Sequence, residues 1–294
     1  MSKKSQKPKG LYTGVKVVKN FQHIGELYKN KKLPLDKVET TVYPNMGLVL
    51  KDGQQSALAV VKQTELRLIP QDIQMFGIKA RNKEQYMAMS LLLDPDIDLI
   101  TITGRAGSGK TLLAMAFAME QLKKGKINKV VLCKSFVPVG REIGFLPGDM
   151  YSKVRPWLGS FYDNFEVLGV PEYELDKMTS SYEDLNFSKY NNGRIELSPI
   201  TFIQGRSISN AVIIVDEAQN LDREIVKQVL SRPAENSKII MVGDPDQIFE
   251  KGLDGTNNGL VGAVKAGKKA DFIGHIHLLK SERSRLAVWA SEEL

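Results

Sequence analysis

The chain of 294 residues has little of what marks a secreted or membrane protein. It contains a single cysteine, Cys133, so no disulfide can form within it, and this cysteine falls in an apolar run at residues 130–133, where a buried core thiol is expected. No apolar stretch approaches the ~18 residues of a membrane span, and the basic N-terminus is not followed by the apolar segment of a signal peptide. We therefore expect a cytoplasmic protein with no membrane partner.

Acidic residues are scarce near the N-terminus. Residues 1–37 hold ten lysines against Glu26 and Asp36, a local net charge of +8 in a chain whose net charge is +7, so the remainder carries −1. Residues 1–10 show no hydrophobic periodicity, and residues 1–37 are predicted to be a basic, partly disordered N-terminal arm. Such an arm is either a solvated tail or a contact with nucleic-acid phosphates, and the composition leaves both open.

The sequence also lacks internal repeats and low-complexity tracts. Its pattern of apolar and polar residues, however, differs between two parts of the chain. Residues 38–76 contain short β-like segments around a turn signal at residues 51–54, which predicts a small antiparallel β module. Over residues 77–294 apolar strands alternate with helical stretches, the pattern of a parallel sheet flanked by helices. The predicted fold class is α/β, with a mainly parallel sheet preceded by the β module.

A complete phosphate-binding loop, or P-loop, has the sequence Gly-Arg-Ala-Gly-Ser-Gly-Lys-Thr at residues 104–111. It lies between an apolar run, expected to be a buried strand, and a helix-like run. Glycines let backbone N–H groups approach phosphate oxygens, Lys110 supplies a positive charge to the β- and γ-phosphates, and Thr111 supplies an oxygen for Mg²⁺. The loop residues predicted to bind nucleotide are Gly104, Arg105, Ala106, Gly107, Ser108, Gly109, Lys110 and Thr111.

Two adjacent carboxylates, Asp216 and Glu217, follow a β-branched run that begins at residue 211. This is typical of a central strand whose carboxyl end meets Mg²⁺ and an attacking water. Asp216 would hold the metal, and Glu217 would polarise the water, which favours hydrolysis over transfer to a substrate hydroxyl. The alternative is an ordinary helix N-cap with an acid in the first turn.

A third apolar run, residues 238–242, ends in Gly-Asp-x-x-Gln at residues 243–247. An amide just beyond a strand next to the acidic one can reach the γ-phosphate or the water, so Gln247 is a candidate sensor. A turn built from Gly, Asp and Pro accounts for the first residues of this segment without a role for Gln247.

Six segments together resemble the PhoH family of phosphate starvation-inducible ATPases. They cover residues 77–294 in order: the P-loop with Leu-Leu-Ala, Gly-Phe-Leu-Pro-Gly-Asp at 144–149, Gly-Arg-Ser at 205–207, Asp-Glu-Ala-Gln-Asn at 216–220, Gly-Asp-x-x-Gln at 243–247 and Ser-Glu-Arg-Ser at 281–284. Several are similar to motifs of superfamily 1 helicases. Residues 10–14 and 42–45 resemble the region that follows the PIN nuclease domain of two-domain members. The metal-binding acids of that domain have no counterpart in residues 1–37, so its ribonuclease activity is not carried over.

The resemblance implies a single RecA-like helicase core that uses ATP and Mg²⁺ and is coupled to RNA or another single-stranded nucleic acid. Unwinding in the 5′-to-3′ direction is associated with the two-domain members. Gln85, 19 residues before the P-loop, resembles the helicase-type glutamine that reads the adenine edge, with an exposed helical glutamine as the alternative. Lys134, Arg141 and Arg206 follow strand ends, where a nucleic-acid strand could track.

Two-lobed helicases place ATP between two similar cores, and the second core supplies an arginine finger. Only 78 residues follow Asp216 here, too few for a second lobe. If Arg283 is the finger, the simplest complete site has one subunit presenting Arg283 to its neighbour's nucleotide, which predicts a homo-oligomeric ring, a hexamer as the family also implies. The alternative is a surface ion pair of Arg283 with Glu282 or Asp271.

Two functions from different classes remain open at this point. One is a nucleic-acid-stimulated ATPase motor, favoured by the acid pair, the candidate sensor and the basic arm. The other is an ATP-dependent switch or assembly module that binds protein partners without translocation.

Overall fold

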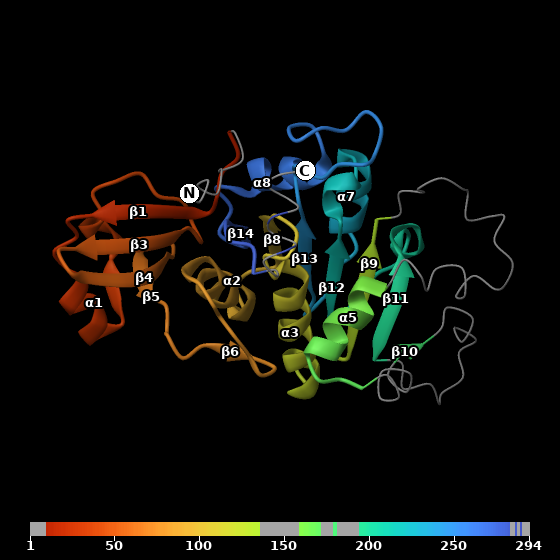
Figure 1. Cartoon of the computed structure of the whole chain (residues 1–294), viewed down its shortest axis with the longest axis horizontal. Helices are drawn as coiled ribbons and strands as arrows, with labels where there is room; N and C mark the ends of the chain where they lie inside the picture. Colours follow the sequence, from red (N-terminus) through yellow and green to blue (C-terminus); the bar gives the residue numbers. More distant parts are fainter. Residues whose placement is uncertain are drawn as a thin grey trace, which may run out of the picture.

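The computed structural model describes residues 10–135, 159–171, 179–180, 194–282, 286 and 289. Within them the chain forms a small N-terminal sheet, a two-stranded ribbon and one large parallel sheet, as Figure 1 shows. In the described part of the chain no helix is long and apolar enough to cross a membrane.

The N-terminal module is a five-stranded sheet with one packed helix. Its elements are β1 (Val15–Lys19), α1 (Ile24–Asn30), β2 (Lys32–Pro34), a 3-10 turn (Leu35–Lys37), β3 (Gly47–Asp52), β4 (Gln55–Val61) and β5 (Glu65–Leu68). The strand order is β1-β3-β4-β5-β2, with β1 and β3 parallel and the other pairs antiparallel. A parallel pair needs a crossover connection, and α1 with β2 lies in the connection between β1 and β3.

Strands β3, β4 and β5, which lie within residues 38–76, pair antiparallel as predicted. The structure corrects the prediction for the preceding residues, because the sheet starts at Val15, inside the segment predicted to be a basic arm through residue 37, and β1 joins it in parallel. The strand signal in β1 is short, and two of its five residues are lysines. Residues 1–9, where disorder is predicted, lie outside the described residues.

The large sheet follows a short ribbon of β6 (Gln74–Met75) and β7 (Ile78–Lys79). Its elements are α2 (Lys83–Leu93), β8 (Leu99–Gly104), α3 (Lys110–Lys123), β9 (Lys129–Lys134), α5 (Gly159–Val167), β10 (Thr179–Ser180), β11 (Ile195–Pro199), β12 (Ala211–Asp216), α7 (Arg223–Leu230), β13 (Lys238–Gly243), α8 (Gly259–Gly267) and β14 (Ile273–Leu278), with 3-10 turns η5 (Ile200–Ile203) and η6 (Ala218–Asn220). In the described residues the order is β10-β11-β9-β12-β13-β8-β14, and every pair is parallel. The predicted α/β fold is confirmed.

Both faces of this sheet are covered. Helices α2, α3 and α5 contribute to one hydrophobic core, and α7 and α8 contribute to the other. Strands β8 and β12 are buried along their whole length, as the near-continuous apolar runs predict for a parallel sheet. Cys133 lies fully buried in the second core, in agreement with the predicted core thiol, and Phe161 on α5 is buried in the first.

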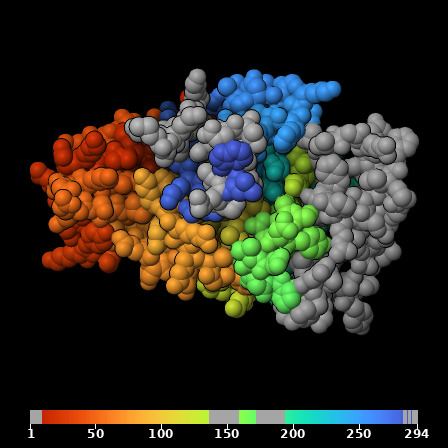
Figure 2. All heavy atoms as spheres, in the orientation of Figure 1, coloured from red at the N-terminus to blue at the C-terminus, as the bar shows by residue number. Residues whose placement is uncertain are grey.

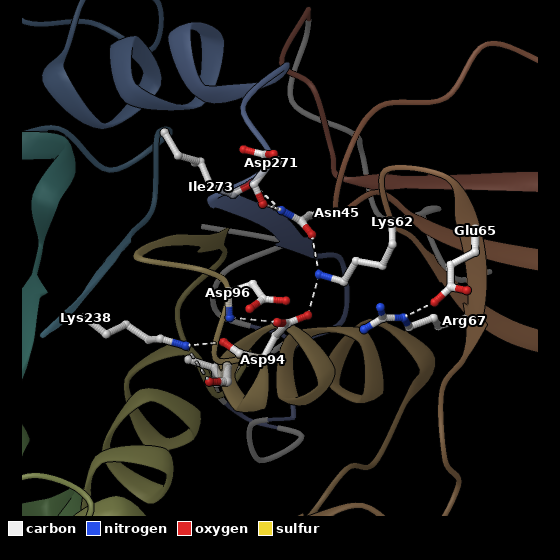
Figure 3. Close-up of polar contacts among 10 residues, drawn as sticks. Asn45, Lys62, Glu65, Arg67, Asp94, Asp96, Lys238, Asp271 and Ile273 are labelled. Carbon is white, nitrogen blue, oxygen red and sulfur yellow. Dashed lines mark hydrogen bonds and ion pairs between the residues drawn. The ribbon is translucent and has the colours of Figure 1, made fainter. Parts of the chain in front are cut away.

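The module and the core meet at a polar junction, drawn in Figure 3. The amide of Asn45 donates to the carbonyl oxygens of Asp271 (2.7 Å) and Ile273 (3.0 Å), and its side-chain oxygen accepts from Lys62 Nζ at 2.7 Å. Lys62 also forms a largely buried ion pair with Asp94 at the end of α2. Asn45 therefore ties the module to the start of β14. Figure 2 shows the module forming one end of the molecule next to the core.

A second contact runs along the outer edge of β14. The main-chain N–H of His277 donates to the carbonyl oxygen of Thr13 (2.9 Å), and Gly47 N donates to Gly14 O (2.8 Å). Gly14 has φ +73°, and a Cβ there would lie 1.9 Å from the carbonyl oxygen of His275. Only glycine permits this approach, which explains Gly14 within the segment at residues 10–14.

We expect Gly14→Ala to lower the free energy of unfolding by more than about 3 kcal/mol, because a strained positive φ is combined with overlap against fixed backbone. The matched control is Gly10→Ala: residue 10 has φ +78°, but a Cβ there would meet nothing within 4 Å, so only a strain of about 1 kcal/mol is expected. Urea unfolding followed by circular dichroism measures both. Equal losses in the two variants would contradict the close approach at Gly14.

Candidate active site

Three segments singled out in the sequence converge at one edge of the sheet. Strands β12, β13 and β8 are parallel neighbours, so their carboxyl ends lie side by side (Figure 1). β8 runs into the P-loop, β12 ends in Asp216, and β13 ends in Gly243. In open parallel sheets ligands bind outside these carboxyl ends, so the edge is the candidate site.

The P-loop turns sharply between β8 and α3. Gly104 and Gly109 have φ angles of 149° and 89°, and a Cβ at residue 104 would lie 2.5 Å from the carbonyl oxygen of Leu278. Helix α3 begins directly at Lys110, so its N-terminus and the N–H groups of its first turn face the loop. This geometry favours a bound anion.

The side chains of the loop differ in their surroundings. Lys110 Nζ donates to the carbonyl oxygens of Gly104 (2.6 Å) and Arg105 (3.0 Å), so the ammonium lies over the loop. Arg105 is exposed and Ala106 is half-buried. Ser108 is fully buried, and its Oγ has no hydrogen-bond partner among the described residues.

Gln85 lies in the first turn of α2 and reaches the P-loop. Its amide Nε2 donates to the carbonyl oxygen of Ser108 at 3.1 Å, and its Oε1 accepts from the N–H of Arg81 at 2.8 Å. The side chain is buried, so it is not the exposed helical glutamine of the alternative interpretation. Asn82 caps the helix, its Oδ1 accepting from Gln85 N at 3.0 Å.

The two predicted metal ligands meet. Thr111 Oγ1 donates to Asp216 Oδ1 at 3.2 Å, across a sequence separation of 105 residues. Asp216 is only 5% exposed, and burial raises its pKa to about 6, with the neighbouring carboxylate of Glu217 adding to the rise and Lys134 opposing it. A hydroxyl and a carboxylate at this spacing are the oxygen ligands that Mg²⁺ prefers.

Glu217 sits in an unusual backbone conformation beside Asp216. Its φ is +54°, and its N–H donates to Asp216 Oδ1 at 3.0 Å. Left-handed non-glycine residues cost free energy and cluster at functional sites. Glu217 stands at the N-cap position of η6, but its side chain makes no capping hydrogen bond. The capping alternative therefore does not account for its carboxylate.

Gln219 is a site residue to which sequence reasoning assigns no role, although the segment 216–220 contains it. It is fully buried, and its Nε2 donates to Glu217 Oε2 (2.7 Å) and to the carbonyl oxygen of Gln247 (2.9 Å). Its Oε1 accepts from the N–H of Asp244 at 3.1 Å. Gln219 thus fixes the Glu217 carboxylate against the loop that follows β13. The only signal in the sequence is its position two residues after the acid pair.

Gln247 occupies an exposed turn at the end of β13. Its N–H donates to Asp244 O at 3.0 Å, and Asp244 Oδ1 accepts from Asp246 N at 3.1 Å, so the predicted turn is present. The backbone oxygen of Gln247 is held by Gln219, while its side chain is exposed at the same edge as Glu217. The sensor role stays a prediction.

Arg283 lies outside the described residues, but the two residues before it do not. Ser281 Oγ donates to Ala106 O at 3.2 Å, and Glu282 N donates to Gly107 O at 2.8 Å. The segment that leads to Arg283 therefore rests on the P-loop of the same chain.

Other candidate residues have structural partners. His275 and His277 are buried, each with Nδ1 within 2.9 Å of a threonine hydroxyl on β8, and burial lowers their pKa values to about 3 and about 4. The described residues contain no group of three or more His, Cys, Asp or Glu side chains that could hold a metal ion. Lys134 Nζ donates to Ser160 Oγ at 3.0 Å, and Arg206 pairs with the buried Glu196. Arg141 lies outside the described residues.

A P-loop between a buried strand and a helix, next to a strand that ends in a carboxylate, defines a P-loop NTPase with a single RecA-like core. Residues 77–291 match the family model described as PhoH-like protein. The chain belongs to the PhoH-like family.

Several curated relatives are similar to the chain. It is 39% identical to Protein PhoH2 of Bacillus subtilis (strain 168), over 97% of this chain and 64% of that protein. It is 35% identical to Protein PhoH2 of Thermobispora bispora, over 84% and 55%, and 37% identical to the PhoH-like protein of Bacillus subtilis, over 62% and 52%. The chain thus spans just over half to just under two thirds of the length of these relatives.

Two solved structures show a weaker likeness. They are the SWI2/SNF2 ATPase core of Sulfolobus solfataricus in complex with dsDNA, with a TM-score of 0.41 and 17% identity over 70% of this chain and 46% of that one, and the Pif1 helicase from Candida albicans, with 0.32 and 13% over 68% and 40%. At these values the likeness adds nothing to the arrangement seen directly in the sheet.

The raised pKa of Asp216 predicts a pH dependence of stability without added metal. Because the folded pKa of about 6 lies above the ordinary 3.8, protonation favours the folded state. The contribution is fully present below pH ~4 and is lost as the pH rises through ~6. Relative to Asp216→Asn, which cannot ionise, the melting temperature of the wild type in EDTA should fall across this window. Parallel curves for the two proteins, measured by scanning fluorimetry, would rule out the shift.

Proposed function

We propose that this protein binds ATP with Mg²⁺ and hydrolyses it at the edge formed by β8, β12 and β13. The observation that carries the proposal is the 3.2 Å contact between Thr111 Oγ1 and Asp216 Oδ1, with the Glu217 carboxylate held alongside by Gln219. Two oxygen ligands and a positioned carboxylate at a P-loop are the parts that nucleotide hydrolysis requires.

The residues present fit Mg-ATP. The N–H groups of Gly107 and Gly109 and those at the N-terminus of α3 bind the phosphates, and Lys110 exchanges the loop carbonyls for the β- and γ-phosphate oxygens. Thr111 and Asp216 hold Mg²⁺, which when bound neutralises charge on the β- and γ-phosphates. The Ser108 hydroxyl is buried and lacks a hydrogen-bond partner within the described part of the chain. This fits a loop whose polar groups bind a ligand.

Gln85 keeps the capacity to read adenine. A side-chain amide has two N–H donors and two acceptor lone pairs, and the contacts with Ser108 and Arg81 use one of each. One donor and one acceptor remain, which match N7 and the N6 amino group of adenine. This supports ATP over nucleotides whose base presents the opposite pattern.

Glu217 acts on water in the hydrolytic step. The water oxygen bonds to the γ-phosphorus while the bond to the bridging oxygen breaks, ADP departs, and the proton released by the water passes to the Glu217 carboxylate. Gln219 orients that carboxylate. Gln247, whose carbonyl oxygen also accepts from Gln219, senses the γ-phosphate. Asp216 stays ionised against the metal.

The work performed is the coupling of hydrolysis to RNA or another single-stranded nucleic acid by a homo-oligomeric ring. The lysine-rich residues 1–37 support nucleic-acid contact, because counterion release from phosphates favours basic surfaces. Within the described residues the P-loop lies on one parallel sheet, with no second lobe beside it, which supports completion of the site by a neighbouring subunit. The contacts of Ser281 and Glu282 with the P-loop of their own chain favour instead a finger in cis.

Phosphate release by the wild type should rise on addition of single-stranded RNA. Lys110→Ala should abolish turnover through lost nucleotide binding, whereas Glu217→Gln should cut kcat by roughly 10²–10⁴-fold with KM nearly unchanged, since it removes the base and keeps the size. The assay is run with RNA, with DNA and without either, across salt concentrations. ATP hydrolysis that no nucleic acid stimulates at any salt concentration would favour the protein-binding switch over the motor.

Arg283→Ala should cut turnover by about 10³-fold with nucleotide binding intact, the usual worth of an arginine finger. A loss below tenfold would remove the role. Mixing Arg283→Ala with Lys110→Ala subunits tests action in trans, because one interface then combines an intact P-loop with an intact finger. Turnover of the mixture above that of either variant alone supports the ring, and no recovery would place the finger on its own subunit.

A further inference from the structure

The outer side of the P-loop is held by groups from two distant segments. Three consecutive loop carbonyls accept hydrogen bonds from outside the loop: Ala106 O from Ser281 Oγ (3.2 Å), Gly107 O from Glu282 N (2.8 Å) and Ser108 O from Gln85 Nε2 (3.1 Å). Two of the donors lie just beyond β14, and the third lies on α2. Nothing in the proposed hydrolytic step uses Ser281 or Glu282.

Asn82 joins these two segments to each other. Its Oδ1 accepts from Gln85 N (3.0 Å) as the cap of α2, and its Nδ2 donates to Glu282 Oε1 (3.0 Å). The C-terminal segment, the start of α2 and the loop tip therefore form one closed hydrogen-bonded set. The Asn82–Glu282 contact spans 200 residues of sequence.

The direction of these carbonyls fixes the direction of loop N–H groups. In a planar trans peptide the C=O and the following N–H point to opposite sides. Holding Ala106 O and Ser108 O outward turns the N–H groups of Gly107 and Gly109 inward, toward the proposed phosphate site. Ser108 N donates instead to Arg105 O at 3.2 Å, which closes the turn between them.

We propose that Asn82, Ser281 and Glu282 form a clamp that holds the P-loop in its phosphate-binding conformation, so that nucleotide affinity depends on the segment that follows β14. The inference rests on the proposed ATP binding. The three are positioning residues, because they act on the loop from the side away from the phosphates.

The clamp predicts a loss of ground-state binding rather than of the chemical step. Loop N–H groups bind the phosphates before and during hydrolysis, so weakening the clamp raises Kd and KM and leaves kcat within about threefold. For Glu217→Gln the expected effects are the reverse, with kcat lowered and KM nearly unchanged. A general loss of folded protein would lower the active fraction instead of raising KM.

Asn82→Asp tests the clamp while keeping the helix cap. The aspartate still accepts from Gln85 N, but it loses the donor to Glu282 and opposes it with a second carboxylate. We expect Kd for a fluorescent ATP analogue to rise about tenfold or more, the worth of a hydrogen bond to a charged group. Asn82→Ser, which caps the helix and adds no charge, should give a smaller rise.

The second half of the test restores the hydrogen bond between residues 82 and 282 with donor and acceptor exchanged. Glu282→Gln keeps an acceptor oxygen and should raise Kd by only about threefold. Combined with Asn82→Asp it supplies an amide donor to the new carboxylate, so the double variant should bind more tightly than Asn82→Asp alone and close to Glu282→Gln. The same exchange should not improve Asn82→Ser.

The outcomes separate the two proposals. If the wild type binds no ATP analogue, the proposed function fails and the clamp fails with it. If the wild type binds and hydrolyses ATP while Asn82→Asp keeps the wild-type Kd, the clamp alone is overturned. The clamp is also overturned if Glu282→Gln does not rescue Asn82→Asp, since the loss in Asn82→Asp would then not come from the contact with Glu282.

Discussion

The parallel register of β12, β13, β8 and β14 is the constraint on which the rest of the site depends. The pairing sets Val215, the residue before Asp216, level with Met241, Gly243 with Thr103, and Leu278 with Gly104. The acid pair, the loop after β13, the P-loop and the C-terminal segment therefore leave the sheet at one height. A slip by one residue in any pair would reverse which side chains face each core, so burial on both faces holds the register.

Local sequence patterns predict the parts of this edge well and their mutual contacts poorly. The P-loop, Asp216 and the strand before each of them are readable because apolar runs and glycine spacing are short-range signals. Gln219 and Ser281 act through hydrogen bonds to main-chain oxygens of segments 28 and 175 residues away. Every residue has a main-chain oxygen, whatever its side chain. The sequence therefore gives no signal for which side chain will donate to a particular one. The same limit explains why the sequence does not predict strand β1. Its parallel partner β3 is identified only from the fold, in which α1 lies in the connection between the two strands.

The basic residues are where expectations from the sequence differ most from the contacts seen in the structure. Of the basic residues predicted to track a nucleic acid, Arg206 is engaged with the buried Glu196, and Lys134 lies beside Asp216, where it opposes the rise of that pKa. Arg206 is thus engaged within the fold at β11, and Lys134 contributes to the electrostatics of the site. The lysines of residues 16–37, counted as an arm in the sequence, belong instead to the folded N-terminal module, where Lys19 and Lys51 are direct neighbours on β1 and β3. Because these lysines lie on ordered elements, any nucleic-acid contact that they make involves an ordered surface rather than a tail.

Strand β14 connects the N-terminal module with the nucleotide site. It is the last strand of the sheet, so its outer edge would be open. Thr13 covers that edge by accepting from His277 N, and Asn45 holds the carbonyl of Ile273 where the strand begins. On its inner side, His277 Nδ1 contacts the hydroxyl of Thr103, the residue just before the P-loop. A strand fixed on both edges and at its start delivers the following residues to a defined place. The contacts of the module thus fix the point from which Ser281 and Glu282 reach the P-loop.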